Sequence, residues 1–250
     1  MRALLALTIL LAGLALLASA DTLYTFNGTV AGYPVNASAD FVAGNGTVAI
    51  TLTNLLANPI NVGQVVGAFS FDVSGFNIPA GATLKSSSGQ SITVNADGSY
   101  SLGATGPTGW TAGWDFISGT ILLCDICASP VTGGSFPAEL LIGPPGGGGK
   151  YTAADSTIAG SGVYNPFLYQ TASFTISTPG VTSSSVISNV DFTVGPKFGV
   201  EAAALAGGGG TQGGGMVPEA ASFLLTGGGF ILVGLVGRLR RFRFFRGVEV

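Results

Sequence analysis

The sequence predicts an all-β fold, an antiparallel β-sandwich or jelly-roll-like single domain. Residues 21–216 are rich in Gly, Ser, Thr, Asn and Val and contain few Lys, Glu or Gln, a composition that favours strands over helices. Short runs with large apolar residues at alternate positions are separated by Gly, Pro, Asn and Asp, which are turn residues. A segment of this length can bury one substantial core.

The N-terminal segment, residues 1–20, has the features of a secretory signal peptide. A single arginine precedes an apolar run over residues 3–17, and the small residues Ala18 and Ala20 form a cleavage site before Asp21. The alternative is a first membrane anchor, but the run is short and no basic cluster follows it. We therefore expect the mature chain to begin at Asp21.

The predicted exported domain, residues 21–200, has little positive charge to offer a polyanion. Over residues 21–216 ten acidic residues face three lysines, a net charge of −7, and that region has no arginine or histidine. A protein that neutralises several phosphates needs Lys and Arg, so nucleic-acid binding is excluded.

The first strands are predicted from two hairpin signals. Residues 23–26 and 29–32 flank Asn27-Gly28, and Asn-Gly favours a tight turn because both residues tolerate positive φ. Residues 40–43 and 47–53 flank a second turn at Gly44-Asn45-Gly46. In the 47–53 run the large apolar side chains alternate, so they are expected on one face of the strand.

Further strands follow the same alternation. The run 65–73 is expected to place Phe69, Phe71 and Val73 on the core face, before a break at 77–81. Residues 91–94 and 99–102 are predicted to form a hairpin through 95–98. Two later strands are predicted over 172–177 and 186–194, the second with one face made of Val186, Ser188, Val190, Phe192 and Val194.

Two tryptophans lie in the less regular central portion. On a strand, the spacing of Trp110 and Trp114 puts both rings on one face, as a sugar-stacking platform needs. The alternative is core packing, because aromatic residues supply much of the large apolar area of this chain. In the sugar-binding interpretation Tyr164 or Tyr169 would contribute as well.

Cys124 and Cys127 are the only cysteines. A zinc site takes four ligands, and the chain has no histidine and no further cysteine to complete one. Because an exported chain meets an oxidising compartment, we expect a small structural disulfide between these two residues.

The chain offers few catalytic combinations. Without histidine, Ser-His-Asp, Cys-His and histidine-metal chemistry are excluded. Paired carboxylates remain for glycoside hydrolysis, and Asp115, Asp125 and Glu139 are the candidates. Nothing in their spacing selects them among the acidic residues, so we expect no enzyme, no cofactor and no metal site.

The C-terminal region has four successive parts. A Gly-rich tether over 201–216 leads to Val217-Pro218-Glu219, and an uncharged apolar run follows over 220–237. Eighteen helical residues span about 27 Å, close to the bilayer core of about 30 Å. Arginines then begin at once, at positions 238, 240 and 241, and are expected to stay in the cytoplasm. The run is therefore predicted to be a transmembrane helix.

This order of parts resembles the PEP-CTERM sorting signal of Gram-negative bacteria. The matching residues are Val217, Pro218 and Glu219, the run 220–237, and Arg238, Arg240 and Arg241. Ala220 stands where the family has a second proline. The resemblance covers residues 217–250 and implies recognition by an exosortase, a membrane-embedded cysteine transpeptidase, with cleavage near the motif.

Export by the Sec machinery would give an inner-membrane-anchored precursor, later processed to a cell-surface or extracellular form. The resemblance implies a structural or adhesive role in the envelope, extracellular matrix or biofilm, with exosortase, the membrane and exopolysaccharide as partners. Two alternatives remain open: a surface-displayed carbohydrate-binding module that uses Trp110 and Trp114, and a permanently anchored protein whose C-terminal helix is never cut.

Overall fold

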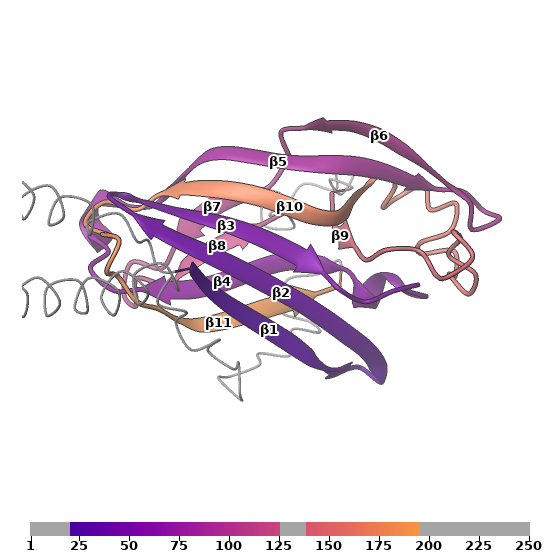
Figure 1. Ribbon diagram of the computed structural model, residues 1–250, viewed down its shortest axis with the longest axis horizontal. Helices are drawn as coiled ribbons and strands as arrows, with labels where there is room; N and C mark the ends of the chain where they lie inside the picture. Colours follow the sequence, from indigo (N-terminus) through magenta and orange to yellow (C-terminus); the bar gives the residue numbers. More distant parts are fainter. Residues whose placement is uncertain (1–20, 126–138, 196–250) are drawn as a thin grey trace, which may run out of the picture. The chain divides into compact units, whose positions relative to one another are not determined.

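The computed structural model describes residues 21–125 and 139–195, which form an all-β domain (Figure 1). These residues build one large, mostly antiparallel sheet of 11 strands and two short 3-10 helices, η1 (Val62–Gln64) and η2 (Ile78–Ala80). The strands are β1 (Asp21–Val30), β2 (Tyr33–Gly44), β3 (Thr47–Asn54), β4 (Val66–Val73), β5 (Thr83–Val94), β6 (Tyr100–Gly106), β7 (Thr111–Trp114), β8 (Ile121–Cys124), β9 (Leu141–Ile142), β10 (Phe167–Ser177) and β11 (Ile187–Val194).

The sheet is branched. Its main path runs β1-β2-β3-β10-β9-β4-β8-β7, while β11 pairs with β4, β5 pairs with β10, and β6 pairs with β5. Strand β9 pairs in parallel with β10 and antiparallel with β4. It thereby connects the half of the sheet that contains β1, β2, β3 and β10 to the half that contains β4, β7, β8 and β11. Among the described strands this β9–β10 contact is the one parallel pairing.

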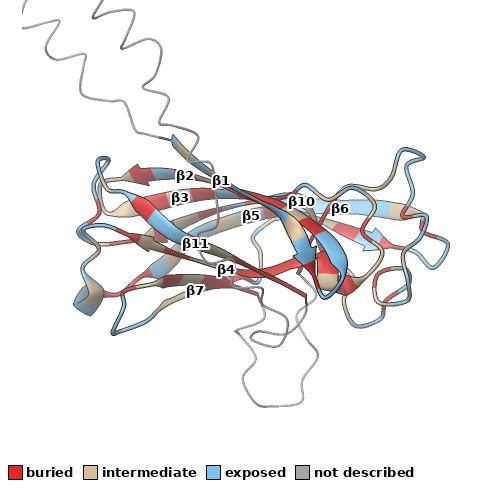
Figure 2. Ribbon diagram, turned by 90° about the horizontal axis from the view of Figure 1, so that it is seen from below, coloured by how far each residue is buried: buried red, intermediate tan, exposed pale blue. Residues whose placement is uncertain are grey.

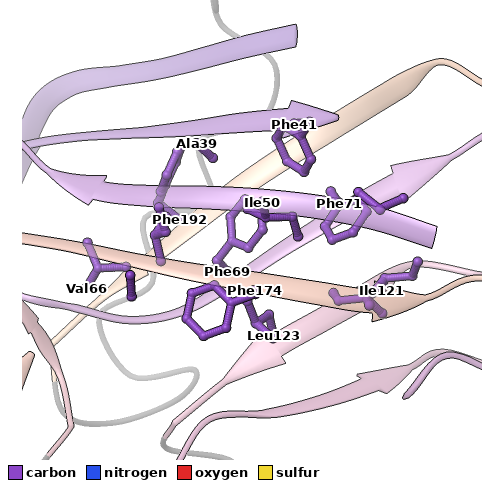
Figure 3. Close-up of a cluster of buried hydrophobic side chains, with 14 of the residues drawn as sticks. Ala39, Phe41, Ile50, Val66, Phe69, Phe71, Ile121, Leu123, Phe174 and Phe192 are labelled. Carbon is purple, nitrogen blue, oxygen red and sulfur yellow. The ribbon is translucent and has the colours of Figure 1, made fainter. Parts of the chain in front are cut away.

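The sheet folds over, so that β2, β3 and β10 face β4, β8 and β11 across the main core (Figure 2). Phe41 of β2 contacts two neighbouring rings of β4, with ring centroids 5.6 Å from Phe69 and 5.1 Å from Phe71. Phe69 also contacts Phe192 of β11 at 5.6 Å (Figure 3). These aromatic contacts supply large buried areas to the core.

Alternating apolar positions predict the inward faces of most strands correctly. In β3, Val48, Ile50 and Leu52 are buried, and β3 pairs with β2 on one side and β10 on the other. The turn at residues 44–47 between β2 and β3 is confirmed, with Gly46 at φ +73°. The predicted hairpin through 95–98 is also confirmed, although β5 begins well before it, at Thr83.

The hairpin predicted at Asn27-Gly28 is wrong. Strand β1 runs straight through both residues, which pair with Asn36 and Val35 of β2, and the chain turns four residues later at Ala31 and Gly32. The Phe26 ring lies over Gly28: a Cβ added to that glycine would lie 2.6 Å from Phe26 Cζ. The ring covers a strand position that lacks a side chain. Pairing of β1 with β2 along its whole length overrides the local preference of Asn-Gly for a turn.

The single apolar face predicted for residues 186–194 holds only in the second half of the run, where Val190, Phe192 and Val194 face the core. Val186 precedes β11 and is 56% exposed, whereas Ile187 is buried in the core. The pairing with β4 shifts register between Ser188 and Asp191, where Asn189 adopts φ +49°. This irregularity changes which positions face inward, and Phe192 is buried beyond it.

A buried amide network fixes one end of the main core. The Asn54 side chain donates to the carbonyl oxygens of Gln64, at 3.1 Å, and Leu141, at 3.0 Å. The Gln64 side chain in turn donates to the Pro34 carbonyl at 2.9 Å and accepts from the Ile60 N–H at 2.7 Å. These bonds connect β3, η1, β9 and the start of β2, and they satisfy polar groups that would be costly to bury alone.

The two ends of the described domain lie at opposite ends of its strands. Asp21 pairs with Val42 beside the turn between β2 and β3. Gly195 follows β11 and donates its backbone N–H to the Val65 carbonyl at 2.8 Å, next to the start of β4. The chain therefore enters at one end of the strands and leaves at the other.

The terminal predictions fall outside the described residues. These are the signal peptide with Ala18 and Ala20, the tether, the motif Val217-Pro218-Glu219, the helix over 220–237 and the arginines after it. Within residues 21–125 and 139–195, no helix has the length and apolar character to cross a membrane.

Candidate functional site

A shallow polar depression forms where β10 changes partners. At its start β10 pairs in parallel with β9, through Leu168 and Tyr169, and from Thr171 onward it pairs with β3. On its other side the pairing with β5 shifts between Leu168 and Ala172, so that β10 carries extra residues opposite β5. Gln170 lies in this irregular segment with φ +57°.

A second irregularity lies on the neighbouring strand pair. Gln90 of β5 pairs with Thr105 of β6, and Ile92, two residues later, pairs with Leu102, three residues earlier in β6. The register therefore shifts by one residue between these two pairs. Gly89 of β5 has no room for a side chain, because an added Cβ would lie 2.9 Å from a Leu168 methyl carbon. Two bulges thus lie beside the same part of β5. Bulges of this kind re-aim side chains and often border functional sites.

The depression is open and has a volume of about 360 Å³, within the range of small-molecule sites. Its lining residues come from β5, β6 and β10, and none of them is charged. They are Ser88, Gly89, Gln90, Thr105, Tyr169, Gln170, Thr171 and Ser173.

Much of the polar lining is not used within the described fold. Side-chain hydrogen bonds within the described ranges involve Gln90, which donates to the Gly103 carbonyl at 3.4 Å, and Thr171, whose hydroxyl lies 3.3 Å from that of Thr53. Four further side chains have hydroxyl or amide groups without a hydrogen-bond partner among the described residues: Ser88, Thr105, Gln170 and Ser173.

An aromatic cluster supports one side of the depression. The half-buried Tyr169 ring lies 6.4 Å from the Tyr100 ring in a stacked arrangement, and Tyr100 contacts Tyr151 edge-on at 6.1 Å. Tyr151 is buried, donates its hydroxyl to the Gly143 carbonyl at 2.8 Å, and has its pKa raised by that burial. The cluster holds the Tyr169 ring in a defined position.

The two tryptophans, for which a sugar-stacking platform and core packing are the alternatives, have different environments. Trp110 is 2% exposed, precedes β7, and packs its ring 5.2 Å from that of Phe174. Its indole N–H donates to the Glu139 carbonyl at 2.8 Å. Trp114 is half-buried and lies 5.1 Å from the exposed ring of Phe116. Core packing therefore accounts for Trp110, and Trp114 alone keeps part of its ring at the surface.

The tyrosines named with the tryptophans share one environment and differ in one respect. Tyr164 and Tyr169 are both half-buried and pack against the second apolar cluster, which includes Ile158 and Phe167. Tyr169 also lines the depression. The glutamines, serines and threonines around Tyr169 carry no pattern that the sequence alone would single out, because the bulges that gather them depend on the pairing of three strands.

The structure brings together two of the three candidate carboxylates. Asp115 accepts hydrogen bonds from the backbone N–H groups of Ile117 and Ser118 in the turn between β7 and β8, and these bonds lower its pKa. Asp125, beyond the far end of β8, lies near Glu139. A Cβ on Gly109 would be 3.8 Å from an Asp125 oxygen and 3.0 Å from a Glu139 oxygen.

Asp125 is a strongly perturbed acid. Its side chain is fully buried, and neither carboxylate oxygen has a hydrogen-bond partner among the described residues. Burial raises the pKa of Asp125 to about 7, with a smaller contribution from repulsion by the Glu139 carboxylate. The Glu139 carboxylate itself accepts a hydrogen bond from the Gly109 N–H. Within the described residues Asp125 is buried and Glu139 is half-buried, so only one acid of this pair reaches solvent.

Cys124 is the buried last residue of β8, and its expected disulfide partner, Cys127, lies outside the described residues. Over residues 21–125 and 139–195, no group of three or more His, Cys, Asp or Glu side chains is placed to hold a metal ion. No protein-family model, curated protein or solved structure matches the chain.

Proposed function

We propose that this chain is an exported surface protein with a structural or adhesive role, sorted and cleaved by an exosortase at its C-terminal signal. The observation that carries the proposal is the order of Val217-Pro218-Glu219, the apolar run 220–237 and Arg238 with the arginines after it. Arginines at the end of an apolar run retain that end in the cytoplasm, which leaves the β domain outside.

The β domain fits this destination. The domain is acidic and sparsely charged, which suits a solvent-exposed module that does not bind polyanions. We further propose that its folded-over sheet is sandwich-like, since side chains of β2 and β4 interleave in one core between the two halves.

The role proposed for the domain is non-enzymatic. In the described fold the closest pair of candidate acids, Asp125 and Glu139, lies beside Gly109, and the Glu139 carboxylate already accepts the Gly109 N–H. The uncharged depression on β5, β6 and β10 is open to solvent, and its lining offers binding groups and no acid–base pair. Adhesion fits these features better than hydrolysis does.

The intact mass of the mature protein tests the sorting proposal. We expect cleavage near Pro218-Glu219 in a host with an exosortase, with loss of Arg238 to Val250, and an intact C-terminus in the same host without it. Pro218→Ala is expected to reduce cleavage. Ala220→Pro, which restores the second proline of the family motif, is expected to increase it. A mass that retains residues 238–250 in the exosortase host would favour a permanently anchored protein.

A further inference from the structure

We infer that the depression on β5, β6 and β10 binds a neutral saccharide, with Tyr169 and Gln170 as its main contacts. The inference rests on the adhesive role proposed above and gives it a ligand class. It does not depend on the sorting signal or on processing of the C-terminus. It also moves the sugar-binding surface away from Trp110, which is buried.

The charge of the lining sets the ligand class. All eight lining residues are uncharged at neutral pH, so the depression has neither a cation to pair with a carboxylate, sulfate or phosphate nor an acid to pair with an amine. Burying an unpaired ligand charge against this surface would cost free energy. A neutral ligand avoids that cost.

The hydrogen-bonding groups match a polyhydroxyl ligand. Each sugar hydroxyl donates and accepts, and so do the hydroxyls of Ser88, Thr105 and Ser173. The Gln170 amide offers both donors and an acceptor, and it has no partner among the described residues. A saccharide can therefore satisfy these groups without breaking a hydrogen bond that the fold uses.

The aromatic group supplies the apolar part of the site. Sugar rings have apolar faces of C–H groups, and tyrosine provides a rigid, amphipathic surface for such faces at low entropic cost. Tyr169 is held by its stack on Tyr100 at 6.4 Å, so its ring is positioned before a ligand arrives. Pre-organisation of this kind lowers the cost of binding.

The backbone of the site is strained where the ligand would sit. Gln170 adopts φ +57° within a strand, in the left-handed region that side chains other than glycine rarely occupy. It does so at the point where β10 leaves β9 and joins β3. Strain of this kind is concentrated at binding and catalytic positions. Glycine would relieve this strain, and the glutamine side chain instead places an unpartnered amide in the depression.

Affinity electrophoresis of the full chain tests the inference, with dextran, laminarin and galactomannan as neutral probes and alginate as an acidic one. The protein should be kept in a polyoxyethylene detergent, because a sugar-based detergent would compete for the site. We expect retardation by at least one neutral polysaccharide and none by alginate. Retardation by no neutral probe, or by alginate alone, overturns the inference.

Variants locate the site. Tyr169→Ala is expected to weaken binding about tenfold, as loss of an aromatic contact implies. Gln170→Gly is expected to weaken it about three- to tenfold through the lost amide, while the thermal midpoint is not lowered because backbone strain is relieved. This second variant separates loss of binding from loss of folding.

Two further variants serve as matched controls. Thr51→Ala changes an exposed hydroxyl of β3 outside the depression and should leave retardation unchanged. Trp114→Ala removes the half-buried tryptophan, which lies outside the depression, and should also leave retardation unchanged. Binding that survives Tyr169→Ala and Gln170→Gly but is lost in Trp114→Ala would contradict the inference. The mass measurement on the C-terminus is independent of all four variants, so failure of one proposal is distinguishable from failure of the other.

Discussion

The Tyr24 hydroxyl donates a 2.6 Å hydrogen bond to the backbone carbonyl of Ile187, 163 residues away in the chain. Tyr24 belongs to β1 and Ile187 begins β11, so this bond joins strands from the two facing halves of the sheet. The Tyr24 ring also contacts Phe41 edge-on at 5.7 Å, which places its hydroxyl across the margin of the core.

Tyr24→Phe should therefore lower the free energy of unfolding by about 1 kcal/mol, the usual net contribution of one hydrogen bond, because the ring contact is retained. Urea denaturation followed by tryptophan fluorescence would measure it. Tyr33→Phe is the matched control, since Tyr33 is exposed and its hydroxyl makes no hydrogen bond with another described residue. Equal effects of the two substitutions would contradict the role given to Tyr24.

Asp125 should make stability depend on pH. Its pKa is about 7 in the folded domain, against 3.8 ordinarily, so between these values the folded state holds a proton that the unfolded state has lost. Stability must then fall as pH rises from about 4 to about 7. The side chain in Asp125→Asn cannot ionise. The free energy of unfolding of this variant should therefore be nearly equal to that of the native chain at pH 3 and greater by about 4 kcal/mol at pH 8.

Asp115→Asn is the control for that experiment, because its effect should have the opposite sign. Backbone hydrogen bonds from Ser118 and Ile117 lower the pKa of Asp115, so its charged form stabilises the fold above the unfolded pKa and that contribution is lost as pH falls through the folded pKa. The Asp115→Asn variant should be less stable than the native chain at neutral pH and equally stable at low pH. If denaturation curves at several pH values show the same profile for both variants, the buried acid does not govern the pH dependence.

Gly98 is a turn glycine whose replacement should be costly. It has φ +75°, and an added Cβ would lie 2.5 Å from the Tyr151 carbonyl oxygen, a backbone atom that cannot move aside alone. Gly98→Ala should lower the free energy of unfolding by about 2 to 4 kcal/mol, from strained φ and overpacking together. Gly46→Ala has a similar φ of +73° and nothing within 4 Å, so it should cost only about 1 kcal/mol. Thermal denaturation of both variants would reveal the difference.

Asp97 should respond more to Ser99 than to Lys150. The Ser99 hydroxyl donates to Asp97 at 2.6 Å, and this bond is the largest cause that lowers the Asp97 pKa to about 2. The Lys150 ammonium group lies 3.3 Å from the same carboxylate and is half exposed, so solvent screens it. An NMR titration should find a larger rise in the Asp97 pKa in Ser99→Ala than in Lys150→Ala. The reverse order would show that the ion pair dominates.

The all-β class and most strands are predictable from the sequence because they depend on local alternation. Val48, Ile50 and Leu52 face the core as their spacing predicts. The failures occur where a distant or neighbouring side chain overrides a local preference. At Gly28 the Phe26 ring and the ladder to β2 suppress an Asn-Gly turn, and at Asn189 a bulge against β4 reverses the inward face.

The candidate site was less predictable for the same reason. The sequence names Tyr169 as an aromatic candidate for sugar contact, but Gln170 and Ser88 lie together only because β10 changes partners beside an irregular part of β5. The spacing of Trp110 and Trp114 assumes one continuous strand. The chain instead begins β7 after Trp110, which leaves that ring in the core.

The positions of Asp21 and Gly195 at opposite ends of the strands determine how the domain carries force. A pull between these two points runs along β1 and β11, parallel to the strand axes. It loads the β1–β2 and β11–β4 ladders in shear, so that many hydrogen bonds resist together. A pull across the strands would instead peel them one bond at a time. The domain is therefore arranged to transmit tension from one end to the other before any single pair of strands separates.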